Sequence, residues 1–104
     1  MSKKLKNLSD FKSTFIYKTE RGDRLYDIAE QFSTTAQILI SDNALKEEPF
    51  CGELLYVEIP HGERYIVKPE DTLELLSQKF NKSELEIANK NKVDDIYVGQ
   101  IIYI

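Results

Sequence analysis

The sequence has little cysteine and little histidine, with one residue of each, Cys51 and His61. A single cysteine excludes an internal disulfide framework and is typical of a reducing compartment. No base or second ligand lies near Cys51 in the sequence, so we expect it to be a small buried apolar residue. His61 has no partner histidine and is expected to be exposed in a loop. The sequence therefore predicts no metal site and no catalytic nucleophile, and we expect no enzyme activity.

Long apolar runs and glycine-rich stretches are missing as well. No stretch approaches the roughly 18 apolar residues of a membrane helix, so no membrane partner is expected. A basic start over residues 1–15 is not followed by the apolar segment of a signal peptide, which predicts synthesis in the cytoplasm. A later spore, cell-wall or particle location stays compatible with this pattern. The glycines form no phosphate-binding loop, and no cofactor is predicted.

Negative charge outnumbers positive charge after the first 20 residues. The formal net charge is −4, yet residues 1–20 contain five lysines against Asp10 and Glu20. The rest of the chain is therefore acidic, which argues against nucleic acid as a partner. Residues 1–13 are interpreted as a basic, flexible N-terminal segment, with contact to an anionic polymer as the alternative.

The chain does contain an internal repeat. Twelve residues, RGDRLYDIAEQF from residue 21, recur 48 positions later as PEDTLELLSQKF. The match extends along both copies, which indicates a duplication. The matching pairs are Tyr17 and Tyr65, Asp23 and Asp71, Leu25 and Leu73, Ile28 and Leu76, Phe32 and Phe80, Leu39 and Ile87, Asn43 and Asn91, and, after a shift of one residue, Gly52 and Gly99, and Leu55 and Ile102.

Each copy shows a strand, two short helices and a second strand. β-Branched and aromatic residues predict the strands, and apolar residues at helical spacing predict helices of roughly nine or ten residues. The fold class is therefore α+β: two tandem small βααβ modules, each a two-stranded antiparallel sheet with two helices packed on one face. The expected strands are residues 15–19, 51–60, 64–68 and 98–104.

The ends of these helices follow from polar residues. Asp23 and Asp71 are expected at the N-caps of the first helices, with Glu74 completing a capping box in the second copy. The second helices should end around Asn43 and Asn91, because asparagine tolerates the left-handed conformation that closes a helix.

The same elements define the expected domain organisation. The first module spans residues 14–60 and the second spans residues 65–104, with a short linker over residues 61–64. Each unit is near the lower size limit for folding without staples, so each should have a compact aliphatic core and some support from its neighbour.

Both copies contain one ordered set of residues. The second copy has Tyr65, Val67, Asp71, Thr72, Leu73, Asn91, Val93, Gly99, Gln100, Ile102 and Ile104, and the first has Tyr17, Gly22, Asp23, Leu25, Ile28, Ala29, Asn43, Leu45, Gly52, Leu55 and Val57. This set, which covers about residues 15–104, resembles the lysin motif (LysM) family of βααβ carbohydrate-binding modules. Three departures stand out: Arg24 replaces a threonine, Glu70 replaces a glycine and Glu53 replaces a glutamine.

The resemblance implies a glycan groove in each module. Such a groove lies between the first strand–helix turn and the loop before the last strand, and takes N-acetylglucosamine-containing glycans such as peptidoglycan or chitin. It would be lined in the first module by Gly22, Asp23, Arg24, Leu25, Leu45, Lys46, Pro49 and Phe50, and in the second by Glu70, Asp71, Thr72, Leu73, Val93, Asp94, Ile96 and Tyr97.

Several of these residues have a structural alternative. Leu25 and Leu73 are expected to face the core, and Thr72 suits the first helical turn as well as a ligand. Arg24 could attract glycan-linked carboxylates or pair with surface acids. Tyr97 lies in the groove loop, whereas Tyr26 should pack or face solvent.

The resulting hypothesis is a non-catalytic glycan-binding protein of two modules. The alternative is an assembly module, such as a spore-coat or phage-particle component, that uses this scaffold to bind a protein partner.

Overall fold

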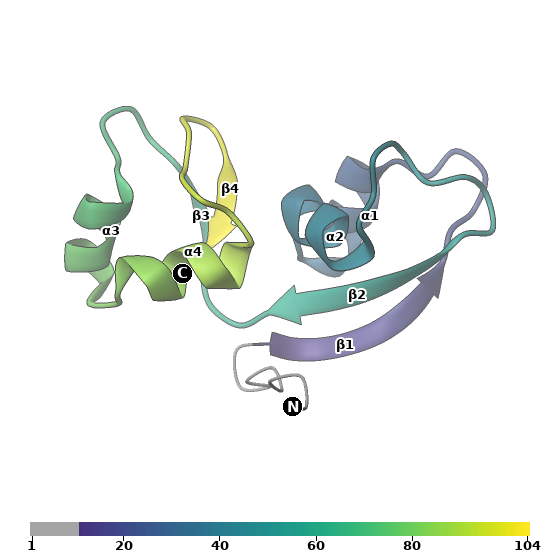
Figure 1. Cartoon of the computed structure of the whole chain (residues 1–104), viewed down its shortest axis with the longest axis horizontal. Helices are drawn as coiled ribbons and strands as arrows, with labels where there is room; N and C mark the ends of the chain where they lie inside the picture. Colours follow the sequence, from purple (N-terminus) through teal and green to yellow (C-terminus); the bar gives the residue numbers. More distant parts are fainter. Residues whose placement is uncertain (1–10) are drawn as a thin grey trace.

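The computed structural model describes residues 11–104, and residues 1–10 of the basic segment lie outside the described part. The order of strand, helix, helix and strand occurs twice in it, which confirms the predicted fold class (Figure 1). The elements of the first module are β1 (Phe11–Lys18), α1 (Leu25–Phe32), α2 (Ala36–Asn43) and β2 (Leu54–Pro60). Those of the second are β3 (Arg64–Ile66), α3 (Leu73–Phe80), α4 (Glu84–Asn91) and β4 (Ile101–Tyr103).

The element bounds differ slightly from the sequence prediction. Each helix has 8 residues, a little shorter than expected. Strand β1 begins at Phe11, so residues 11–13 belong to a strand and not to the basic segment. No helix within residues 11–104 is long and apolar enough to cross a bilayer.

Each sheet is one antiparallel pair. In the first module β1 pairs with β2, with Phe15 opposite Val57, and in the second β3 pairs with β4, with Tyr65 opposite Ile102. Alternate residues of β2, Leu55 and Val57, are fully buried because a strand presents every second side chain to the helices.

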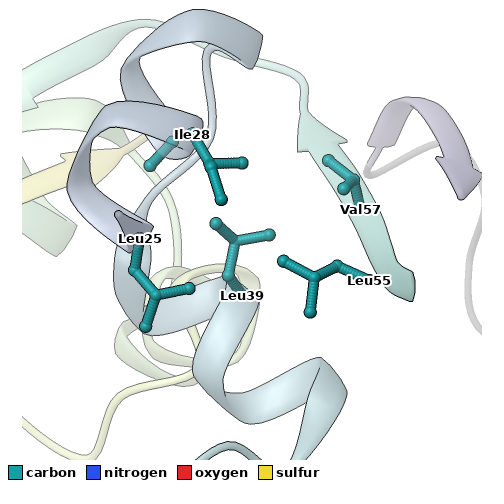
Figure 2. Packing of buried hydrophobic residues seen from close by; sticks show 6 residues of the cluster. Leu25, Ile28, Leu39, Leu55 and Val57 are labelled. Carbon is teal, nitrogen blue, oxygen red and sulfur yellow. The ribbon is translucent and has the colours of Figure 1, made fainter. Parts of the chain in front are cut away.

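The core of each module lies between its sheet and its two helices. Figure 2 shows Leu25 and Ile28 of α1, Leu39 of α2, and Leu55 and Val57 of β2 pointing toward one another. The second core repeats this arrangement with shorter strands, and consists of Val67, Leu76, Ile87, Ile102 and Ile104. Both cores are aliphatic, as the repeat predicted.

Aromatic side chains close one end of each core. The Phe32 ring meets those of Phe15 and Tyr17 edge to face, with ring centroids 5.0 Å apart in both pairs. The Tyr65 and Phe80 rings form the matching pair at 5.6 Å. The aromatic positions shared by the two copies are therefore packing positions.

Asn43 and Asn91 do end helices α2 and α4, but not for the predicted reason. The left-handed residues are Ala44 and Lys92, with φ of 51° and 57°. The asparagine side chains instead bind the closing strand. Asn91 Nδ2 donates to the carbonyls of Ile87 and Tyr103, at 2.9 and 2.8 Å, and Asn91 Oδ1 accepts from the Tyr103 backbone N–H at 2.7 Å. Asn43 makes the same three bonds in the first module.

Polar contacts join the two modules. Arg64 Nη2 lies 3.1 Å from Glu30 Oε2 of α1. Lys92 Nζ lies 3.5 Å from Asp42 Oδ1 and 3.8 Å from Glu58 Oε1, whose side chains are 4% and 0% exposed. The linker packs closely against the C-terminal residue of the second module. At Gly62, with φ of 109°, an added Cβ would lie 2.0 Å from the Ile104 carbonyl oxygen, so there is no room for a side chain.

Candidate glycan-binding site

A tyrosine–aspartate pair organises the turn before the first helix of each module. The Tyr17 hydroxyl donates to Asp23 Oδ2 at 2.5 Å, and the Glu20 backbone N–H donates to the same oxygen at 2.8 Å. Tyr65 and Asp71 form the identical pair, with the Lys68 N–H as the second donor. The prediction that Asp23 and Asp71 cap the helices is therefore wrong, because these carboxylates close the preceding turn.

Neighbouring residues take the N-cap positions. Thr72 Oγ1 accepts from the Leu75 N–H at 3.0 Å, so Thr72 caps α3 and Glu74 does not complete a capping box with Asp71. Arg24 is the N-cap residue of α1, and its side chain accepts no hydrogen bond from the backbone N–H groups of the first helical turn. The two modules thus differ in which side chain accepts a hydrogen bond from the free backbone N–H groups at this helix N-terminus.

The pair also shifts the acidities of its members. The hydrogen bond to Asp23 raises the pKa of Tyr17 to about 12, and the same bond lowers the pKa of Asp23. The second pair behaves alike, with the pKa of Tyr65 raised and that of Asp71 lowered by their mutual hydrogen bond. Both carboxylates are therefore ionised at neutral pH and already occupied by protein donors, which limits their role as direct ligand contacts.

Glu48 fills the place between the two segments of the first predicted groove. Glu48 Oε1 accepts from the Leu25 backbone N–H at 2.7 Å, and Glu48 Oε2 lies 3.8 Å from Arg24 Nη2. The Leu25 N–H is at the N-terminus of α1, where the helix dipole favours an anion. Sequence reasoning missed Glu48, because its partner is 23 residues away.

The structure brings the predicted residues of the first groove together. Turn residues 22–25 and loop residues 45–50 meet through Glu48, and the Thr19 hydroxyl donates to the Phe50 carbonyl at 2.7 Å. Leu25 is buried in the core, as expected, and Leu45 packs against the same cluster. The exposed residues of this set are Gly22, Arg24, Lys46 and Phe50, while Asp23 and Pro49 are half-buried.

The second predicted groove has the same two segments without an acidic bridge. Leu73 and Ile96 both pack against the second core. Within residues 11–104, no side chain accepts a hydrogen bond from the Leu73 N–H, the equivalent of Leu25 N–H. The exposed residues of this set are Glu70, Thr72, Asp94 and Tyr97, while Asp71 and Val93 are half-buried.

An exposed aromatic residue lies at the same place in both late loops. The Phe50 N–H donates to Glu53 Oε1 at 3.1 Å, and the Tyr97 N–H donates to Gln100 Oε1 at 3.0 Å. Glu53 therefore performs the turn-closing role of the glutamine it replaces. Phe50 is 71% exposed and Tyr97 is 68% exposed, so both rings can contact a ligand.

Gly22 in the first module and Glu70 in the second occupy the same position, and both have a positive φ. Gly22 has φ of 88°, and a Cβ added there would meet nothing within 4 Å. Glu70, its counterpart, has φ of 75°, a region that side chains rarely adopt. The position thus has a left-handed backbone in both turns, which a glycine adopts without strain and a glutamate does not.

One further residue, Cys51, lies elsewhere than its sequence context suggests. Cys51 is exposed, so the prediction of a buried thiol is wrong; it lies in the turn before β2 and not in the core. Tyr26, expected to pack or face solvent, is 59% exposed and lies beside a cleft between the modules. His61 is exposed, as expected. Among residues 11–104 no group of three or more metal-binding side chains occurs.

With this geometry in place, comparison with known proteins identifies the family. The model of the LysM domain matches two segments of the chain, residues 17–48 and residues 65–104. The chain therefore belongs to the LysM domain family. LysM domains are binding domains rather than catalytic domains, and they generally bind peptidoglycan or chitin-like glycans.

Solved structures give a partial likeness. The chain is 32% identical to the Bacillus megaterium QM B1551 spore cortex-lytic enzyme SleL, with a TM-score of 0.44, over 91% of this chain and 23% of that one. It is 29% identical to the Bacillus cereus spore cortex-lytic enzyme SleL, with a TM-score of 0.43, over 88% of this chain and 23% of that one. The chain thus spans less than a quarter of either enzyme. A search of curated protein sequences gives no match.

Proposed function

We propose that this chain is a non-catalytic binder of N-acetylglucosamine-containing glycans of the peptidoglycan or chitin type. Membership of the LysM family is the observation that carries the proposal. The geometry supports it, since each module juxtaposes a helix N-terminus with a loop that exposes an aromatic ring. An acetamido sugar requires backbone donors for its carbonyl oxygen and an apolar surface for its methyl group and ring face.

The two grooves do not contribute equally in this proposal. In the first, the Glu48 carboxylate occupies the Leu25 N–H, a donor that a glycan carbonyl would otherwise use. In the second, no side chain of the described residues takes the Leu73 N–H, and Thr72 retains its hydroxyl proton for donation. The second module is therefore the stronger glycan binder, and the first contributes weakly to two-site engagement.

Sedimentation with insoluble polymers tests the proposal. The purified protein is incubated with peptidoglycan and with chitin at moderate salt, and cellulose, which lacks acetamido groups, is the control polymer. Sedimentation with peptidoglycan or chitin, but not with cellulose, is expected. Tyr97→Ala should reduce the bound fraction more than Phe50→Ala. A protein that stays in solution with both acetamido polymers would refute the proposal, and equal losses in the two variants would refute the asymmetry.

A second candidate function, protein binding in an assembly, is favoured by the outer face of the first sheet. Ile16 of β1 and Leu54 of β2 are 60% and 64% exposed, although both lie on paired strands. Contiguous apolar patches mark interaction surfaces, and Ile16 and Leu54 lie on neighbouring strands of one sheet. Failure of glycan binding, together with self-association that Ile16→Thr abolishes, would support this candidate. With either function, the glycan or protein that the chain binds would determine whether it is located on a spore, a cell wall or a particle.

A further inference from the structure

A cleft of about 170 Å³ lies between the two modules, and Tyr97 is the one residue that it shares with the predicted grooves. The first module provides residues of α1, of the α1–α2 junction and of the start of α2. The second provides residues of the turn before β4 and of β4 itself. Its lining includes Tyr26, Thr34 and Gln37 from the first module, and Tyr97 and Gln100 from the second.

Contacts on either side of the cleft hold its walls together. Gln37 Nε2 donates to the Lys92 carbonyl at 3.3 Å, and Arg64 binds Glu30, which itself lines the cleft. Lys92 also reaches the buried carboxylates of Asp42 and Glu58. The cleft is therefore a property of the two-module unit and would not exist in either module alone.

Two tyrosines contribute aromatic rings to the apolar surface of the cleft. Tyr26 is 59% exposed and Tyr97 is 68% exposed, one from each module. The face of a tyrosine ring carries negative charge density and attracts the C–H groups on the face of a pyranose ring. Tyr97 also belongs to the late loop of the second predicted groove, so the cleft and that groove share this side chain.

The polar groups of the cleft fit an uncharged, hydroxyl-bearing ligand. Thr34 is 2% exposed, and its hydroxyl has no hydrogen-bond partner within the described chain. A buried hydroxyl is normally satisfied, so Thr34 lacks a donor or acceptor that a ligand can provide. The side-chain oxygen of Gln100 accepts from the Tyr97 N–H, which leaves its amide N–H groups to donate to a ligand. The side-chain nitrogen of Gln37 donates to the Lys92 carbonyl, which leaves its side-chain oxygen to accept from a ligand.

The size of the cleft limits what it can hold. Sites that enclose a whole drug-sized ligand have roughly 300–1,000 Å³, so a cleft of about 170 Å³ takes one ring of a longer molecule. We propose that this cleft binds one pyranose residue of the glycan chain that occupies the second groove, with Tyr26 and Tyr97 against the sugar faces and Thr34 bound to a sugar hydroxyl. This proposal rests on the proposed glycan-binding function and adds a subsite built by both modules.

Substitutions that touch the cleft but neither groove test the proposal. Tyr26→Ala should weaken binding to the polymer that sediments the wild-type protein by about fivefold, and Tyr26→Phe should retain binding because the ring is kept. Thr34→Val keeps the side-chain shape and removes the hydroxyl, and a loss of about threefold is expected. Leu85→Ala, at a side chain 69% exposed on α4, is the matched control and should bind as the wild type does.

Binding isotherms and melting temperatures of the same samples separate the outcomes. A loss in Tyr26→Ala and Thr34→Val at unchanged melting temperature supports the cleft. If Tyr26→Ala unfolds, Thr34→Val decides, since an unpaired hydroxyl contributes little to folding. Wild-type affinity in both variants overturns the cleft and leaves the proposed function intact. A wild-type protein that binds neither peptidoglycan nor chitin overturns both.

Discussion

Replacing Asn91 by alanine should destabilise the second module, because it removes the bonds that join α4 to β4. The Asn91 side chain is 2% exposed and makes three hydrogen bonds, one to its own helix and two to Tyr103 in β4. At about 1 kcal/mol for each bond, the loss amounts to about 3 kcal/mol of the free energy of unfolding. The substitution also leaves the N–H and carbonyl of Tyr103 buried without their partner, so this figure is a lower bound.

The magnitude is large relative to the stability of such a small unit. Domains are stable by roughly 5–15 kcal/mol, and a module of this size lies at or below the lower end. A loss of about 3 kcal/mol should lower the melting temperature by more than about 10 °C. Asn89→Ala is the matched control, because Asn89 lies on the same helix, is exposed and makes none of these bonds.

Urea denaturation followed by circular dichroism measures the effect. A destabilisation of Asn91→Ala by at least about 2 kcal/mol, with Asn89→Ala within about 0.5 kcal/mol of the wild type, is expected. The reasoning would be refuted if Asn91→Ala were as stable as the wild type, or if both substitutions had the same effect, since the loss would then reflect helix propensity and not the bonds to β4.

Four other outcomes follow from the structure. Glu48→Ala frees the Leu25 N–H and should raise affinity for the polymer about threefold by opening the first groove; unchanged or weaker binding in the sedimentation assay contradicts this. Glu70→Gly removes a side chain from a left-handed position and should stabilise the protein by about 0.5–1 kcal/mol in urea titrations; a destabilised variant contradicts it. The pKa of Tyr17 is raised from 10.0 to about 12, so its neutral form stabilises the fold below pH 10, and this contribution is lost as pH rises through 12. Tyrosinate absorbance should therefore show that Tyr17 ionises late, and Asp23→Asn should return the pKa of Tyr17 toward 10. Lys92→Met removes a cation from two buried carboxylates and should cost about 3 kcal/mol of the free energy of unfolding in urea titrations; a variant as stable as the wild type contradicts this.

The sequence predicted the elements because their signals are local. Apolar spacing within 8 residues located α1 and α3, and the repeat confirmed each element by its second copy. The same local rules failed where a partner lies farther away. Asp23 looks like a helix cap from its neighbours, yet its partner is Tyr17, six residues earlier and across the turn.

The site was predictable only in outline. Family resemblance located the two loops of each groove, but a resemblance does not describe what one particular side chain does across space. Glu48 reaches the helix N-terminus through tertiary contact, and the cleft beside Tyr26 exists only because two modules dock. Neither feature leaves a periodic or motif signal. Both depend on which surfaces meet after the secondary structure has formed.

The tyrosine–aspartate pair has a consequence for how duplicated modules diverge. Tyr17 with Asp23, and Tyr65 with Asp71, fix the turn by bonds that do not involve the residues on either side of the aspartate. Those flanking positions hold a glycine and an arginine in one copy, and a glutamate and a threonine in the other. Substitution at these positions can therefore change the exposed surface while the tyrosine–aspartate bond is kept, as the two copies show. The two copies can thus present different surfaces at this turn while both keep the bonds that close it.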